Sequence, residues 1–344
     1  MEEGSADLIM LGRSTLADPF WPVKAQMGHS EDIVPCIRCL QCYHVSTDHK
    51  NVQCSVNPRF NREKRVPLIL PVTGHPKHLV IVGGGPAGIT CALTASRRGH
   101  QVTLLEKEPV LTGKLNIACH GEHKADLRRF RDYLLTQLRK SSVTVHTGVL
   151  ADTDVVRGLK PDALVIAVGA TPSRIPLPGV DGDNCMQISE FLQSPDTSLQ
   201  HYIIIGGGSV GCETALDLAE KGKDVSIIEM TDCLASASND LYRLALSEHF
   251  ARYDNLHTNL NSACQSIDAD GVNVLTNGAS THISGDKVLL SLGFRPDAKQ
   301  VSSLYGIVPD TYYVGDCERV ATVAEAVNNA YFIGANVFQE QDII

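Results

Sequence analysis

The sequence lacks any long apolar run, and no stretch approaches the roughly 18 residues that a membrane-spanning helix needs. Its first residues, MEEGSADLIM, also lack the basic region that opens a secretory signal. Positive charge is in short supply as well, because the net charge is -9 at pH 7, and this argues against broad binding to nucleic acid. These absences predict a cytoplasmic protein with neither a membrane nor a nucleic-acid partner.

The sequence also lacks low-complexity segments and short repeats. Its 344 residues are 43% hydrophobic, which is enough for a buried core and for two or three domains. Eleven cysteines, an odd number, are present. In a cytosolic chain they favour metal ligation, redox chemistry or burial over structural disulfides.

Two segments share one plan. From His78 the chain reads HLVIVGGGPAGITCALTASRRGHQVTLLEKE, with an apolar run, a glycine turn, a helix-length stretch and a second apolar run that ends in Glu106. From Tyr202 it reads YIIIGGGSVGCETALDLAEKGKDVSIIEMTD, the same plan 123 residues later, with Glu229 at the matching place. Each segment predicts a βαβ unit, and the pair predicts two dinucleotide sites.

The glycines of the first turn have separate predicted roles. Gly83 permits the tight turn, Gly85 lets a pyrophosphate approach the backbone, and Gly88 lets the helix pack on the strand. Glu106, 23 residues after Gly83, can accept hydrogen bonds from an adenosine ribose. A single such motif often serves packing only, but two complete copies favour dinucleotide binding. The second copy consists of Gly206, Gly208, Gly211 and Glu229.

The choice of nicotinamide cofactor depends on Glu229. Its carboxylate would repel a 2′-phosphate, and the residues that follow, MTDCLA, contain no arginine to bind one. NADH is therefore favoured over NADPH. The alternative is that Glu229 is a solvated residue at a strand end and that a distant residue holds the phosphate.

Further segments resemble those of the two-dinucleotide flavoprotein superfamily that includes the disulfide reductases. ALVIAVGATP (163–172) and LLSLGFRP (289–296) resemble the strands where such chains cross between domains. The resemblance implies that Asp316, in YYVGDC, binds the flavin ribityl chain and that a helix beginning near Thr322 and Val323 points at the flavin ring. It assigns FAD to the first turn and NADH to the second. A disulfide reductase itself is not expected, because the stretch after Glu106 holds only Cys119.

Four cysteines cluster in PCIRCLQCYHVSTDHKNVQC (35–54). The spacing CxxCxxC, followed after eleven intervening residues by one more cysteine, resembles the ligand sets of 4Fe-4S clusters. Zinc is the competing interpretation, with His44 or His49 able to replace a thiolate. FAD converts the two electrons of NADH into single ones, so a cluster beside a flavin has an electron source. The predicted ligands are Cys36, Cys39, Cys42 and Cys54.

The flanks of this cluster, GSADLIMLGRSTLADPFWPVKAQMG (4–28) and VNPRFNRE (56–63), resemble the junction in multidomain NADH:flavin oxidoreductases. This old yellow enzyme-type group includes 2,4-dienoyl-CoA reductases, 2-enoate reductases and trimethylamine dehydrogenase. The resemblance implies a TIM barrel with FMN before the cluster and reduction of an activated C=C bond. Gly12 and Arg13 match the phosphate-binding turn of that barrel, with DLIML (7–11) as its last strand.

A barrel needs roughly 250 residues, so FMN can bind only if a partner subunit or an upstream segment supplies the rest. The expected fold is α/β: a barrel fragment (1–30), a cluster-binding segment (31–75), a discontinuous Rossmann-like FAD domain (76–178 and 290–344) and an inserted NAD(P)H domain (179–289). The alternative is a truncated fragment that acts only as an NADH diaphorase or is inactive. No catalytic side chain or final acceptor can be assigned, and a homo-oligomer is compatible with the sequence. The small subunit of glutamate synthase shares the glycine units but not the barrel-like N-terminal region.

Overall fold

The computed structural model describes residues 4–338. The outer ends of the predicted barrel fragment and FAD domain, residues 1–3 and 339–344, lie outside the described residues. Within residues 4–338, no helix combines the length and the apolar character that crossing a bilayer requires.

The chain forms two compact units. The first contains the chain up to Cys119, Lys124–Ala170 and the chain from Pro296 onward, and the second contains His120–His123 and Thr171–Arg295. At Ala170–Thr171 and at Arg295–Pro296 the chain passes between the units within two short strands that pair with each other. These strands are β5 (Ala170–Pro172) and β14 (Phe294–Pro296).

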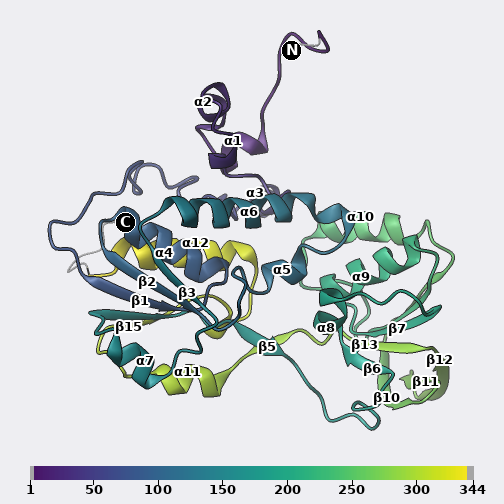
Figure 1. The fold of residues 1–344 in the computed structure, drawn as a ribbon. Helices are drawn as coiled ribbons and strands as arrows, with labels where there is room; N and C mark the ends of the chain where they lie inside the picture. Colours follow the sequence, from purple (N-terminus) through teal and green to yellow (C-terminus); the bar gives the residue numbers. More distant parts are fainter. Residues whose placement is uncertain (1–3, 339–344) are drawn as a thin grey trace. The chain divides into compact units, whose positions relative to one another are not determined.

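The first unit is built on a five-stranded sheet in the order β15-β4-β1-β2-β3, with every pair parallel (Figure 1). Its central strand, HLVIV, is apolar on both faces: Leu79 and Ile81 enter one hydrophobic core and Val80 and Val82 the other. A parallel sheet buried on both faces needs helices on both sides. The strands are β1 (His78–Val82), β2 (Gln101–Glu106), β3 (Thr144–Thr147), β4 (Ala163–Ile166) and β15 (Thr311–Tyr313).

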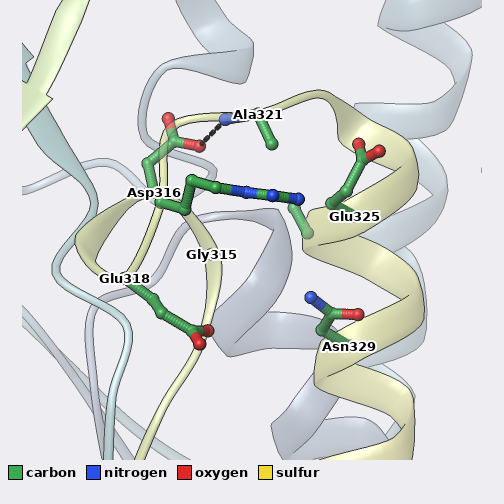
Figure 2. Close-up of a pocket in the computed structure, with 8 residues that line it drawn as sticks. Gly315, Asp316, Glu318, Ala321, Glu325 and Asn329 are labelled. Carbon is green, nitrogen blue, oxygen red and sulfur yellow. Dashed lines mark hydrogen bonds between the residues drawn. The ribbon is translucent and has the colours of Figure 1, made fainter.

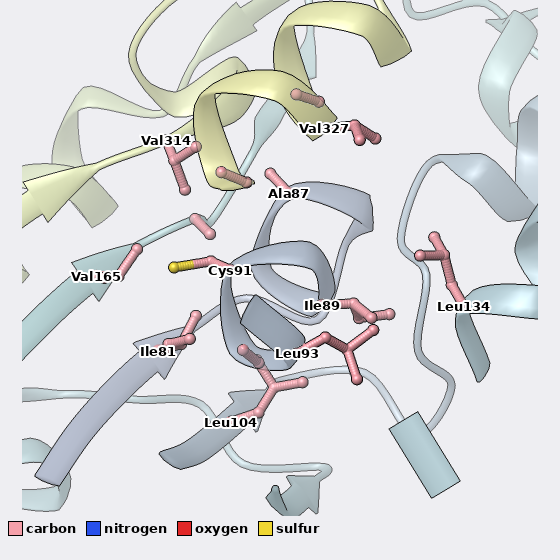
Figure 3. Close-up of a cluster of buried hydrophobic side chains, with 14 of the residues drawn as sticks. Ile81, Ala87, Ile89, Cys91, Leu93, Leu104, Leu134, Val165, Val314 and Val327 are labelled. Carbon is pink, nitrogen blue, oxygen red and sulfur yellow. The ribbon is translucent and has the colours of Figure 1, made fainter. Parts of the chain in front are cut away.

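Helices supply both of these covers. On the Ile81 face, α12 packs along α4, and α4 also contacts α6. Figure 3 shows Cys91 of α4 beside Ile81 and Val165, and Cys91 is fully buried, as the sequence predicts. Residues of α7 and α11 join the opposite core. The helices are α4 (Pro86–Arg97), α5 (Leu115–Ala118), α6 (Ala125–Lys140), α7 (Thr153–Gly158), α11 (Ala298–Leu304) and α12 (Val323–Asn336), with 3₁₀ turns at Glu122–Lys124 and Gly315–Cys317.

The N-terminal segment differs from the expectation in one respect, because residues 7–11 form no strand. A strand needs a hydrogen-bonding partner, and none of the described strands pairs with this segment. Leu8, Ile9 and Met10 are therefore 90%, 65% and 95% exposed. The helices that follow are α1 (Arg13–Ala17), α2 (Trp21–Gln26) and α3 (Gln41–Thr47), with a 3₁₀ turn at Ser30–Asp32.

The second unit repeats the parallel plan in the order β6-β13-β7-β8-β9. Helical residues and the strand residues Tyr202 and Ile204 form one core, which includes the fully buried Cys212. The strands are β6 (Cys185–Gln187), β7 (His201–Ile205), β8 (Asp224–Ile228), β9 (Leu256–Asn259) and β13 (Lys287–Leu290), and the helices are α8 (Ile188–Gln193), α9 (Ser209–Glu220) and α10 (Asp240–Phe250).

An antiparallel sheet covers the other face of this unit, where the first unit has helices. Val272 and Val274 of this sheet are fully buried against Ile203 and Ile205 of β7. The sequence analysis did not anticipate this substitution of a sheet for helices. The three strands, in the order β10-β11-β12, are β10 (Ser262–Asp268), β11 (Gly271–Thr276) and β12 (Ala279–Ser284).

Candidate cofactor sites

The first glycine turn lies between β1 and α4 and has one open side. Gly83 has a φ of +113°, and a Cβ there would clash with the carbonyl of Ala167. A Cβ at Gly88 would clash with the carbonyl of Gly83, so the helix can pack this close to the turn only because residue 88 has no side chain. At Gly85, by contrast, a Cβ would meet nothing within 4 Å. The open space at Gly85, beside the N-terminus of α4, is a suitable place for a pyrophosphate.

Glu106 ends β2 directly beside this turn and is 7% exposed. Its Oε2 accepts the backbone N–H of Gly84 at 2.6 Å, and its Oε1 accepts that of Glu108 at 2.9 Å. A carboxylate oxygen can accept more than one hydrogen bond, so a ribose hydroxyl can still donate to either oxygen. The carboxylate thus fixes the turn and remains able to bind a nucleoside.

A loop that the sequence analysis missed closes over the turn. Thr112 adopts a left-handed φ of 76° and donates its backbone N–H to the carbonyl of Gly84 at 2.7 Å. Two residues later, Lys114 Nζ donates to Asp316 Oδ2 at 2.8 Å. The available signal was Gly113, which directly follows Thr112, because glycine often marks a turn.

Asp316 lies in the 3₁₀ turn before α12 and borders a pocket of about 190 Å³. Figure 2 shows its carboxylate turned toward Ala321, whose backbone N–H donates to Oδ1 at 3.2 Å. Lys114 occupies the other oxygen. The lining residues are Gly315, Asp316, Glu318, Arg319, Ala321, Glu325, Ala326 and Asn329.

The helix expected near Thr322 and Val323 begins there. Thr322 is the N-cap, and its Oγ1 accepts the backbone N–H of Ala324 at 3.1 Å. The side chain of Glu325 in turn accepts a hydrogen bond from the backbone N–H of Thr322 at 3.1 Å. This reciprocal capping box fixes the direction in which α12 leaves Asp316.

The second turn repeats the first at an offset of 123 residues. Glu229 Oε2 accepts the backbone N–H of Gly207 at 2.6 Å, and Ala235 donates to the carbonyl of Gly207 at 2.8 Å. Glu229 is less buried than Glu106, and its Oε1 accepts both the N–H and the hydroxyl of Thr231 at 2.9 Å. Its carboxylate is therefore hydrogen-bonded within the turn and is not simply a solvated group at the end of a strand.

The glycines of the second turn divide in the same way as those of the first. A Cβ at Gly206 would clash with the carbonyl of Ser291, and a Cβ at Gly211 would clash with that of Gly206. At Gly208 a Cβ would meet nothing within 4 Å. The second turn thus offers the same open approach to a pyrophosphate.

The cysteine loop has an unusual backbone. Arg38 and Leu40, which flank Cys39, have left-handed φ values of 51° and 57°. Such residues cost free energy and persist where the surrounding structure requires them, often at ligand sites. Cys36 and Cys54 are half-buried against the core of the first unit, whereas Cys39 is exposed. Cys39 Sγ lies 3.1 Å from the hydroxyl of the buried Ser55.

The four thiols share one electrostatic environment. Burial raises the pKa of the Cys54 thiol to about 11, and the nearby Cys39 and Cys36 also raise it. The pKa of Cys42 is raised by burial and then by the same two neighbours, while Arg13 lowers it. Bound metal would have to displace these protons, because the thiolate is the ligand.

The separation of the thiols bears on which metal they fit. Around one zinc ion, ligand sulfurs 2.3 Å from the metal would lie about 3.8 Å from one another. Among residues 4–338, no three of these sulfurs lie within 4.8 Å of one another. In a 4Fe-4S cluster each thiolate binds a different iron, so the sulfurs lie farther apart. Within the described residues the four thiols therefore do not stand at the spacing of a formed zinc site.

Gly12 and Arg13, the predicted flavin-phosphate residues, are the N-cap and the first residue of α1, and both are exposed. They line a cavity of about 720 Å³ together with Cys36 and Arg38. The chain therefore places the predicted phosphate turn beside the cysteine loop. Asp18, 2% exposed, helps to fix this segment by accepting the backbone N–H of Val34 at 2.9 Å.

Comparison with known proteins identifies the fold. Residues 77–330 match the family described as pyridine nucleotide-disulphide oxidoreductase. The chain belongs to this family. It is thus a flavoprotein oxidoreductase with Rossmann-type folds that bind FAD and NAD(P)H.

Several relatives extend the match to almost the whole chain. The NADH oxidase of Thermoanaerobacter brockii is 33% identical over 96% of this chain and 52% of that protein. The bilirubin reductase of Mediterraneibacter gnavus is 32% identical over 98% of this chain and 52% of that protein. A 2-naphthoyl-CoA reductase structure, with 29% identity and a TM-score of 0.92, is matched over 98% of this chain and 51% of its own. The chain spans about half the length of these relatives.

Proposed function

We propose that this oxidoreductase is the NADH-dependent electron-transfer part of a larger flavin and iron–sulfur enzyme. FAD binds at the first turn, NADH at the second, and a 4Fe-4S cluster at the four clustered cysteines. Electrons continue to FMN in a TIM barrel, where an activated C=C bond of an enoate or enoyl-CoA is reduced. When bound, FAD takes two electrons from NADH as a hydride and releases them singly, as a cluster requires.

One observation carries this proposal. Cys36 and Cys54 pack against the same hydrophobic core as Ala87 and Ile89, which belong to the helix after the first glycine turn. The candidate cluster site and the candidate FAD site are therefore parts of one compact unit. Within it, Gly85 leaves room for the pyrophosphate, Glu106 accepts from the ribose, and Asp316 accepts from the ribityl chain.

The proposed electron acceptor is inferred from the names and lengths of the relatives. Two of them are named for the reduction of bilirubin and 2-naphthoyl-CoA, both unsaturated organic compounds. The relatives are about twice as long as this chain, which supports a barrel supplied by a partner subunit or an upstream segment. Residues 1–30 would then be its last βα unit, with Gly12 and Arg13 at the FMN phosphate.

Anaerobic purification, followed by an optical spectrum and by iron, sulfide and flavin analysis, tests the proposal. We expect FAD without FMN, about four irons per chain as Cys₄ ligation of one cluster requires, and bleaching of the flavin by NADH. Zinc in place of iron, or flavin that stays oxidised, would overturn it. NADH-dependent dye reduction without enoate reduction by the isolated chain would identify an NADH diaphorase, the activity expected when no barrel is present.

A further inference from the structure

The backbone of Cys54 is held by a buried side chain from α12. Asn328 is 6% exposed and lies on the side of the helix that faces the cysteine loop. Its Nδ2 donates to the carbonyl of Cys54 at 3.1 Å and to that of Ala324 at 2.9 Å. Its Oδ1 accepts from Arg62 Nη1 at 3.0 Å. Both amide N–H groups and the amide oxygen are thus engaged.

Arg62 completes this attachment from the other side of the loop. Its Nη1 also donates to the carbonyl of Pro58 at 2.9 Å. Its guanidinium lies 5.1 Å from the centre of the Phe332 ring, one helical turn beyond Asn328. The loop after Cys54 is therefore fixed to α12 by hydrogen bonds at both of its ends and by a cation–π contact.

The same helix begins at the candidate flavin site. Thr322 caps α12 beside Asp316, and Asn328 follows six residues later. At 1.5 Å per residue, the cap and the Asn328 position are about 9 Å apart along the helix axis. A helix is stiff over such a length, so it sets a fixed separation between the Asp316 turn and the Cys54 backbone.

We propose that Asn328 is a positioning residue that fixes the fourth cluster ligand relative to the flavin, so that electrons pass between them at a defined separation. The inference rests on the proposed function, since it requires the cluster at Cys54. Polar groups just behind metal ligands orient those ligands and tune the metal, and the charge and hydrogen bonding around an iron–sulfur cluster set its potential.

Asn328→Asp is the sharpest test because it removes the two hydrogen bonds that the amide donates and keeps the size of the side chain. The introduced carboxylate has the size of the amide and still accepts from Arg62, but it cannot donate to the carbonyls of Cys54 and Ala324, and it adds negative charge. Asn51→Asp is the matched control: Asn51 is exposed and lies three residues before Cys54 on the same loop. Both variants receive the same change in charge and size.

The variants would be purified anaerobically and studied by stopped-flow mixing with NADH, by EPR and by redox titration. For Asn328→Asp we expect flavin content and the rate of flavin bleaching to stay within twofold of wild type. Cluster reduction should slow about tenfold, within the range found for groups behind metal ligands. The midpoint potential of the cluster should fall, and its EPR signal should shift.

The comparison separates two kinds of failure. Iron missing from the wild type would overturn the proposed function and the role of Asn328 with it. A wild type that holds a cluster, together with an Asn328→Asp protein whose potential, EPR signal and cluster reduction match those of Asn51→Asp, would overturn the role of Asn328 alone. An Asn328→Asp protein that loses FAD as well as iron would show a general folding role and would also overturn it.

Discussion

The two glycines Gly85 and Gly88 are three residues apart, yet their replacement by alanine should have opposite effects. Gly85 has an ordinary extended backbone, with φ -73° and ψ 179°, and open space where a Cβ would stand. Alanine at such a position restricts the unfolded chain and stabilises the folded one by about 0.4–1 kcal/mol. The Gly85→Ala apoprotein should therefore be slightly more stable than wild type.

FAD binding should respond in the other direction. The new methyl group would stand in the space through which the pyrophosphate approaches the backbone. Loss of one hydrogen bond to a charged group costs about 1.5–3 kcal/mol, which corresponds to about a 10- to 150-fold increase in Kd. Urea unfolding of the apoprotein would measure the first effect and titration with FAD the second.

Gly88→Ala provides the contrast. Its Cβ would clash with the carbonyl of Gly83, so the helix must shift, at a cost of about 1–3 kcal/mol in the free energy of unfolding. If Gly85→Ala bound FAD with wild-type affinity, the first turn would not hold the pyrophosphate. If Gly85→Ala destabilised the apoprotein as much as Gly88→Ala, the conclusion that a Cβ at residue 85 has open space would be wrong.

Three further predictions follow from the second turn and from the surface. Gly208→Ala should raise the KM for NADH about tenfold or more through the same lost hydrogen bond, with FAD content unchanged; an unaltered KM in a dye-reduction assay would contradict this. Glu229→Gln should lower the ratio of kcat/KM for NADH to that for NADPH about fivefold, since like charges about 4 Å apart in water repel by ~1 kcal/mol; a constant ratio would refute the charge argument. Lys140 lowers the pKa values of Glu31 and Asp32 through hydrogen bonds, so the stability gained from them is present above their usual values of 4.5 and 3.8 and is lost as the pH falls below these. Lys140→Gln should therefore be less stable than wild type at pH 7 and equal to it near pH 2. Urea unfolding across this pH range measures the difference, and a difference in the free energy of unfolding that persisted at pH 2 would contradict the argument.

Sequence patterns predicted the parts of this fold that local rules determine. The two parallel sheets follow from apolar runs joined by glycine turns. The beginning of α12 was expected from the resemblance to the flavoprotein superfamily, and it coincides with a threonine that has glutamate three residues later. The role of Gly85 was predicted from its place in the motif, and the space beside it is compatible with that role. Such features depend on residues that are close in the sequence.

Features that depend on distant residues were not predicted. Residues 7–11 were expected to form a strand because they resemble the last strand of a barrel, but none of the described strands pairs with them. The bond from Asn328 to Cys54 joins residues 274 positions apart, and nothing near either residue signals the other. Lys114 likewise meets Asp316 only because two separate strands of one sheet bring their following loops together.

The exposure of Cys39 has a consequence for handling the protein in air. Its neighbour Arg38 has a side chain that is 67% exposed, so this corner of the loop is open to solvent in the described part of the chain. A cluster bound there would meet dissolved dioxygen directly, because the shell around a metal site controls what reaches it. The half-life of the iron–sulfur absorbance in aerated buffer would then report how completely neighbouring protein shields the loop, and it should lengthen when a barrel-bearing partner binds.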